Sequence, residues 1–178
     1  RRDPTRKAVV KGKQPREKRP KYLNQFELRT MLMALQLDDD HLNDYLLLLV
    51  AKTGLRFGEA LGLTPSDIDF QTQQINVEKT WNYKDPEGGF AHTKNRSSQR
   101  KVRMDWSLCM HLKHLCNGRD PSKPLFVTEG KRISNATVND RLATICKQCN
   151  IPAITIHGLR HTHASLLLYA GVSVASVA

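Results

Sequence analysis

The period of the hydrophobic pattern changes twice along this chain of 178 residues, and this feature constrains the fold most strongly. In residues 24–61 and again in 106–170, apolar side chains recur at the three- and four-residue intervals that gather them on one helix face. Between these regions, in residues 68–104, short runs alternate apolar and polar side chains, which is typical of half-buried strands. Helices, a small antiparallel sheet and helices again predict an α+β domain that is mostly helical.

Capping and turn residues divide these regions into elements. Asn24 followed by Glu27 is typical of a helix start, and Gly54 is typical of a helix end. We expect helices at 24–36, 39–53, 56–61, 106–116, 135–149 and 157–170, and β-like runs at 68–70, 74–83 and 100–104. The stretch "FAHTKNRSSQRKVRM" (90–104) predicts a strand, an exposed polar turn and a strand, and Ser173 is expected to cap a further helix.

Positive charge is concentrated at the start of the chain. The formal net charge is +11, and residues 1–21 hold ten Lys or Arg residues against two acids, with three prolines. Such a segment has too little apolar surface to fold alone, so we expect a basic linker or arm at 1–21 and a folded domain at 22–178. Basic arms bind phosphate backbones through counterion release, although a solvated linker without a partner has the same composition.

The hydrophobic and cysteine content excludes several classes of protein. The longest apolar run, "YLLLLVA" (45–51), is too short to span a bilayer, and the basic N-terminus lacks the apolar region of a signal peptide, so we expect a cytoplasmic protein without membrane contact. The four cysteines form the pairs Cys109/Cys116 and Cys146/Cys149. Each pair is expected on one helix face; a zinc site is conceivable, and buried free thiols are the simpler interpretation.

Three short motifs carry candidate chemistry. The first is "TGLRFGEALGL" (53–63), where Arg56 follows a glycine-terminated helix and Glu59 lies three places later on the same face. The guanidinium of Arg56 matches phosphate geometry, and Glu59 either orients it or pairs with it at the surface.

The second motif, "HTKNRSSQRKVR" (92–103), contains five basic residues and no acid. Lys94 at the tip of the expected hairpin has the length to reach into a groove, although a solvated turn would look the same. Four further side chains near it are expected to contact phosphates: Arg96, Arg100, Lys101 and Arg103.

The third motif is "HGLRHTH" (157–163). His157 and Arg160 are three residues apart and project from one helix face. A guanidinium that holds phosphate oxygens beside an imidazole that moves a proton suits chemistry at a phosphate. His157 and His161 could instead bind zinc, but the glutamate that separates the histidines of zinc proteases is missing.

In this order and spacing, the three motifs resemble the catalytic domain of tyrosine recombinases, in particular the integrases of bacteriophages and conjugative transposons. The resemblance covers residues 22–178 and implies that family's fold, with a small three-stranded antiparallel sheet. It implies that Arg56 and Arg160 clamp a DNA phosphate, with His157 beside Arg160. Glu59 would support Arg56, and Lys94 would protonate the leaving 5′-oxygen. It also implies double-stranded DNA as partner, self-association on DNA (tetramers in the family), a place on bacterial DNA, and no metal or cofactor.

The family's nucleophilic tyrosine has no counterpart among the tyrosines of this chain. The family places it beyond the segment "AGVSVASVA", past Ala178. Tyr22 precedes every motif, Tyr45 lies in an apolar helix and Tyr83 in an expected strand. Tyr169 is expected to face the core, opposite Arg160 on one helix. We therefore expect a catalytic domain truncated before its nucleophile, which binds DNA but does not cleave it. Two alternatives stay open: a DNA-binding or regulatory protein on an inactive recombinase scaffold, and a metal-dependent nuclease that uses the histidines.

Overall fold

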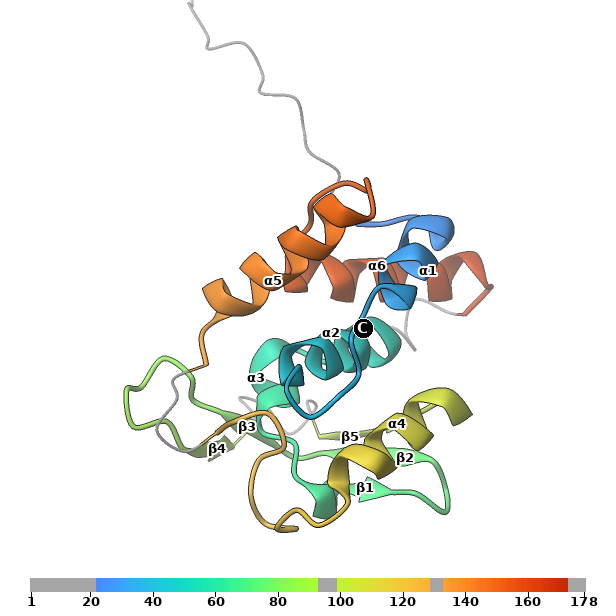
Figure 1. The fold of residues 1–178 in the computed structure, drawn as a ribbon. Coiled ribbons are helices and arrows are strands. Elements are labelled where there is room, and N and C mark those ends of the chain that lie inside the picture. Colours follow the sequence, from blue (N-terminus) through green and yellow to red (C-terminus); the bar gives the residue numbers. More distant parts are fainter. Residues whose placement is uncertain (1–21, 93–98, 129–132, 173–178) are drawn as a thin grey trace, which may run out of the picture.

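Helix α2 lies at the centre of the computed structural model, as its nearly continuous apolar sequence predicts. The structure describes residues 22–92, 99–128 and 133–172. Figure 1 shows α2 with α1, α5 and α6 on one side and the strands and α4 on the other. The elements are α1 (Gln25–Met33), α2 (Leu42–Thr53), α3 (Phe57–Leu61), η2 (Pro65–Asp67), β1 (Ile68–Asp69), β2 (Gln74–Val77), β3 (Lys79–Trp81), β4 (Phe90–His92), β5 (Arg100–Arg103), α4 (Trp106–Cys116), α5 (Asn135–Gln148) and α6 (Ile156–Tyr169).

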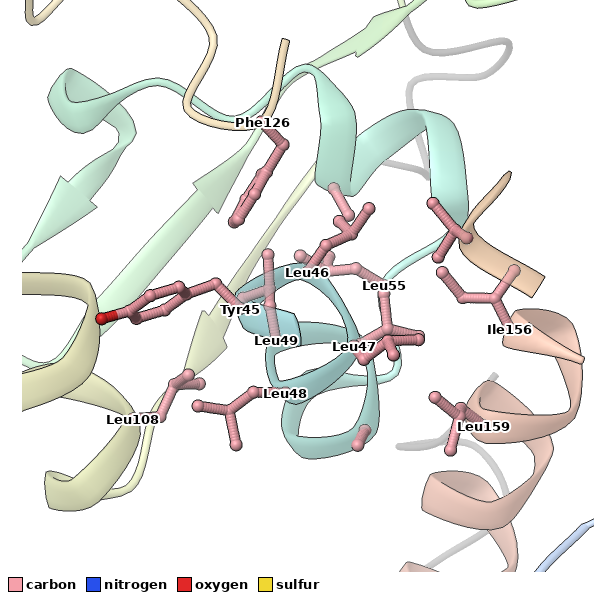
Figure 2. Close-up of a cluster of buried hydrophobic side chains, with 14 of the residues drawn as sticks. Tyr45, Leu46, Leu47, Leu48, Leu49, Leu55, Leu108, Phe126, Ile156 and Leu159 are labelled. Atoms are coloured by element: carbon pink, nitrogen blue, oxygen red, sulfur yellow. The ribbon is translucent and has the colours of Figure 1, made fainter. Parts of the chain in front are cut away.

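Side chains of α2 join the two halves of the core. Leu46, Leu47 and Leu49 are fully buried. In Figure 2 they lie between Leu108 of α4 on one side and Leu159 of α6 on the other. A helix that is apolar on nearly every face must be covered on every face, and this explains why elements from both ends of the chain pack around α2.

A bidentate ion pair fixes α5 against the start of α2. Arg141 donates from Nε to Oδ1 and from Nη2 to Oδ2 of Asp44, both at 2.7 Å, and the backbone amide of Gln36 donates to Oδ2 at 2.8 Å. The Asp44 carboxylate is completely buried, so its charge is compensated entirely by these hydrogen bonds.

The strands confirm a small antiparallel sheet and correct its connections. A three-stranded sheet has the order β1-β2-β5, and a separate ladder joins β3 to β4. The hairpin expected at 90–104 is wrong: β4 and β5 do not pair with each other but with successive parts of residues 74–81, as the pairs Lys79↔His92 and Val77↔Arg100 show. The chain instead reverses at Gly88 and Gly89, whose φ angles of 69° and 133° suit glycine. This turn returns β4 directly alongside β3.

The helices lie where the periodicity places them, with ends that differ by up to three residues. Asn24 and Glu27 form both halves of the expected capping box on α1. Tyr169 contradicts its prediction: it is 83% exposed, because it is the last residue of α6 and none of the described elements covers it. Several predictions lie outside the described residues: the arm at 1–21, the roles of Lys94 and Arg96, and the further helix that begins at Ser173. Within the described parts, no helix is both long and apolar enough to cross a membrane.

Candidate phosphate-binding site

The link between α2 and α3 positions the first candidate side chains. Gly54 ends α2 in the left-handed conformation, with φ 65°, and its amide donates to Val50 O at 2.9 Å. Arg56 then caps α3 in an extended conformation, and its backbone amide donates to Oε2 of Glu59 at 3.0 Å. The glutamate thus closes the first turn of α3 and fixes the backbone of the arginine it was expected to support.

Glu59 is the centre of a charged cluster. Its Oε1 accepts a hydrogen bond from Arg56 Nη1 at 2.8 Å, and its Oε2 accepts one from Arg100 Nη2 at 2.9 Å. The Glu59 side chain is 4% exposed, against 55% for Arg56 and 31% for Arg100. Burial raises the pKa of Glu59, but the hydrogen bonds from Arg100 and Arg56 outweigh it and leave the pKa below its usual value. The carboxylate is therefore ionised and holds two guanidinium groups in place.

Two glycines let α3 lie directly on β3. A Cβ on Gly58 would lie 2.5 Å from Thr80 Oγ1, and one on Gly62 would lie 2.9 Å from the carbonyl carbon of Thr80. Because both residues lie on one face of α3, the helix approaches the strand at backbone distance. The spacing of Gly58 and Gly62, four residues apart, indicates such close packing in the sequence, but the packing was not predicted.

Arg160 reaches the same place from α6. Its Nη1 donates a hydrogen bond to the carbonyl oxygen of Gly54, the residue two places before Arg56. Burial lowers the pKa of Arg160, and the positive charges of Arg56 and Arg100 lower it further, while Glu59 opposes them. Three guanidinium groups thus lie in one electrostatic neighbourhood with one carboxylate, an arrangement that favours an anion such as a phosphate.

Local caps hold the start of α6. Thr155 accepts from the amide of Gly158 at 3.2 Å, and Asn139 of α5 accepts from the amide of Ile156 at 2.8 Å. His157 therefore lies in the first turn of a well-anchored helix. Its ring is exposed and meets the ring of His161 edge to face, with centroids 4.4 Å apart.

The structure separates the basic residues of β5. Arg100 shares one face of the strand with Val102 and turns to Glu59, whereas Lys101 and Arg103 are exposed on the other face. The role of Arg100 as a partner of Glu59 was not predicted, and neither was the position of His163, whose ring packs on Gly54. Lys94 and Arg96 are outside the described residues. The structure brings together four of the other predicted residues: Arg56, Glu59, Arg100 and Arg160. His157 lies one turn before Arg160 on α6, and its ring contacts His161.

Metal-ligating side chains do not gather in the part of the chain that is described. There, no group of three or more His, Cys, Asp or Glu residues could hold a metal ion. Cys109 and Cys146 are buried, Cys116 and Cys149 are partly buried, and all four are free thiols. Burial raises the pKa of the Cys116 thiol to about 11, which disfavours the thiolate that binds metals.

Comparison with known proteins identifies relatives of the chain. The family model described as "Phage integrase family" matches residues 21–178. The integrase of Staphylococcus phage L54a is 31% identical over 142 residues, which are 71% of this chain and 40% of that protein. The ICEBs1 integrase of Bacillus subtilis (strain 168) is 29% identical over 133 residues, which are 67% of this chain and 35% of that protein. The chain thus spans well under half of the length of these curated relatives.

Solved structures confirm the expected fold. The Tn1549 transposon integrase in complex with a circular intermediate DNA superposes with a TM-score of 0.75 at 21% identity, covering 92% of this chain and 58% of that one. XerA recombinase superposes with a TM-score of 0.65 at 25% identity, covering 92% of this chain and 55% of that one. The mostly helical α+β fold, predicted from the hydrophobic pattern and implied by the family resemblance, is that of these recombinases.

Proposed function

The chain belongs to the phage integrase family, and on that premise we propose that it forms the phosphate-binding part of a site-specific DNA recombinase. In the proposed reaction, a tyrosine hydroxyl attacks a DNA phosphate, a 3′-phosphotyrosyl bond forms, and the 5′-oxygen leaves with a proton. The reverse attack by another 5′-hydroxyl rejoins the strands. One P–O bond replaces another at each step, so neither ATP nor a redox partner is required.

The observation that carries this proposal is the arginine cluster around Glu59. Negative charge builds up on the non-bridging oxygens of the phosphate in the transition state, and preorganised cations stabilise it most effectively where water is partly excluded. Arg56 and Arg160 are proposed to bind these oxygens. Glu59 leaves over half of the Arg56 side chain exposed to a ligand while fixing its backbone and one Nη group.

Proton transfer is assigned to His157 and Lys94. His157 is exposed in the first turn of α6, three residues before Arg160, where it can hydrogen-bond the same phosphate. The family resemblance is the basis for Lys94 as the acid that protonates the leaving 5′-oxygen. Double-stranded DNA is the proposed partner, with self-association on it. We propose further phosphate contacts at Arg96, Lys101, Arg103 and the arm at 1–21. The proposed location is the cytoplasm of a bacterium.

No nucleophile is assigned within this chain. Tyr45 is buried and donates to the carbonyl of Leu37, and Tyr83 packs against Phe57. Tyr169 is exposed, but it lies nine positions after Arg160 and half a helical turn out of phase with it. We therefore propose that residues 1–178 by themselves bind DNA without cutting it.

Arginine substitutions test the proposal in the gene product that contains this sequence. With a DNA substrate carrying its recombination site, Arg56→Ala and Arg160→Ala should each lower the rate of covalent protein–DNA adduct formation by roughly a hundredfold or more. Lys113→Ala, which removes an exposed charge on α4, is the matched control and should leave the rate unchanged. Near-normal rates in both arginine variants would refute the assignment.

The isolated chain gives a second, independent test. Its DNA affinity should fall steeply with salt, and no covalent adduct should accumulate. A covalent adduct with residues 1–178 would show that one of their tyrosines is the nucleophile. A full-length gene product that binds DNA but never cuts it would favour the alternative of a regulatory protein on an inactive scaffold.

A further inference from the structure

We propose that His163 is a positioning residue whose ring rests on Gly54 and thereby sets the distance between α6 and the turn that carries Arg56. This inference rests on the proposed function, because it concerns how Arg160 and Arg56 are brought to one phosphate. His163 does not touch the phosphate in this proposal. It acts through the backbone of the α2–α3 turn.

Two side chains of α6 contact the C-terminal end of α2. Arg160 donates to Gly54 O, and His163, three residues later on the same face, places Nδ1 3.2 Å from Ala51 O. The last carbonyl groups of a helix have no partner within the helix, so both contacts satisfy groups that would otherwise need water. The end of α2 is therefore held at two points, one turn of α6 apart.

The ring of His163 occupies the space that a side chain at position 54 would need. A Cβ on Gly54 would lie 2.7 Å from Cδ2, 3.3 Å from Cγ and 3.5 Å from Nε2 of His163. Contacts below 3 Å force one partner to move, and the ring is held by its approach to Ala51 O. Glycine at 54 thus serves two purposes: it adopts φ 65°, and it lets the imidazole lie against the backbone.

The ring contact, rather than the hydrogen bond, is proposed to carry this role. The Nδ1 to Ala51 O distance of 3.2 Å is at the long end of the hydrogen-bond range, so this bond is weaker than the steric constraint that the ring and Gly54 place on each other. The surroundings of the ring disfavour its cationic form: burial lowers the pKa of His163 and the nearby Arg160 lowers it further, which outweighs the opposing effect of the contact with Ala51 O. A neutral flat side chain is what the position requires, so phenylalanine should substitute for histidine.

A double-mutant cycle tests the contact without any assay of activity. We would measure the unfolding equilibrium of the isolated chain with Gly54→Ala, His163→Ala and both. Alanine at 54 strains the left-handed backbone in either background, but it meets the ring only when His163 is present. Gly54→Ala should therefore raise the unfolding equilibrium constant at least tenfold more in the native background than beside His163→Ala. If the change in the unfolding equilibrium constant of the double variant equals the product of the two single-variant changes to within a factor of two, the proposed contact is refuted.

A second experiment links the contact to Arg160. In the gene product that contains this sequence, His163→Ala should lower the cleavage rate at saturating DNA at least tenfold while the DNA Kd stays within about twofold. His163→Phe should retain the rate within about threefold. His114→Ala, an exposed histidine on α4, is the control and should change neither quantity.

The outcomes separate this inference from the proposed function. If Arg160→Ala abolishes cleavage but His163→Ala does not slow it, the positioning role is wrong and the site assignment stands. If neither variant affects cleavage, the proposed function itself fails. Loss of activity in His163→Phe as well as His163→Ala would overturn the ring contact in favour of the hydrogen bond to Ala51.

Discussion

Replacement of Glu59 by glutamine is the sharpest test of the charged cluster, because it changes the charge of one buried group and almost none of its volume. The carboxylate accepts four hydrogen bonds, from the amide of Arg56 at 3.0 Å, Arg56 Nη1 at 2.8 Å, and Arg100 Nη2 and Nη1 at 2.9 and 3.3 Å. These divide evenly between the two oxygens. Whichever way the glutamine amide turns, its NH₂ group meets two donors and two of the hydrogen bonds are lost.

The cost follows from what is lost. A hydrogen bond contributes about 1 kcal/mol net, and about 1.5–3 kcal/mol when one partner is charged. Arg56 is more than half exposed, so water replaces part of its interaction and the lower end of that range applies to it. We expect Glu59→Gln to lower the free energy of unfolding by about 2–3 kcal/mol at pH 7.

Denaturant unfolding of the isolated chain measures this change, and pH provides a second readout. The pKa of Glu59 lies below the usual value of 4.5, despite burial, because Arg100 and Arg56 donate to it. Its stabilisation is therefore complete above that value and is lost as pH falls through the lowered pKa. The native and Glu59→Gln chains should converge in acid. Glu78→Gln, the same change at an exposed position, should have no effect. Equal stability of the native and Glu59→Gln chains at pH 7 would refute the reasoning.

Four further measurements examine other parts of the fold and site. Gly62→Ala should destabilise the chain by about 1–3 kcal/mol in denaturant unfolding, because its Cβ would lie 2.9–3.0 Å from backbone atoms of Thr80 and Trp81, which cannot yield as a flexible side chain does. Arg141→Ala should cost about 3–5 kcal/mol in the same assay, since it leaves the buried Asp44 carboxylate without its ion pair, and Asp44→Ala in addition should recover part of the loss. The lowered pKa of His163 predicts stability that is fully present above its usual value of 6.5 and declines as pH falls below it; His163→Phe should flatten that decline between pH 7.5 and 5. Inorganic phosphate should raise the unfolding temperature more than chloride at equal ionic strength, and Arg160→Ala should reduce the difference to the general stabilisation that an excluded salt provides.

Most of the helices could be predicted because their signals are local. The capping box at Asn24, the glycine at the end of α2 and the apolar period all act within a few residues of where they are read. Strand pairing failed at β4 and β5, because pairing joins residues distant in sequence and two strands can each find a partner along residues 74–81. The prediction that Tyr169 faces the core was wrong for a related reason. Helical phase gives the side of α6 on which Tyr169 lies, but it does not show whether another element packs on that side.

The candidate site divides in the same way. Arg56 and Glu59 are three residues apart, so their pairing follows from helical geometry alone. Arg100 and Glu59 are separated by 41 positions, and Arg160 and Gly54 by 106, and nothing in the local pattern joins them. The family resemblance supplied Arg160 as a partner of Arg56, yet it did not supply the backbone carbonyl through which Arg160 is held. The partners of a charged group are decided by the fold as a whole.

The charges of the cluster are consistent with a ligand that is itself an anion. Burial lowers the pKa of Arg160, and the positive charges of Arg56 and Arg100 lower it further, while Glu59 opposes them. The charged form of Arg160 is thus disfavoured both by burial and by its two guanidinium neighbours. If only the stability of the fold mattered, a neutral or acidic side chain would be favoured at the position of Arg160. The chain instead holds Arg160 through Gly54 O, a dipole that fixes the side chain without cancelling its charge. A phosphate bound among these arginines would reduce the repulsion between them. The cluster therefore lowers the stability of the protein without ligand and raises its affinity for an anion.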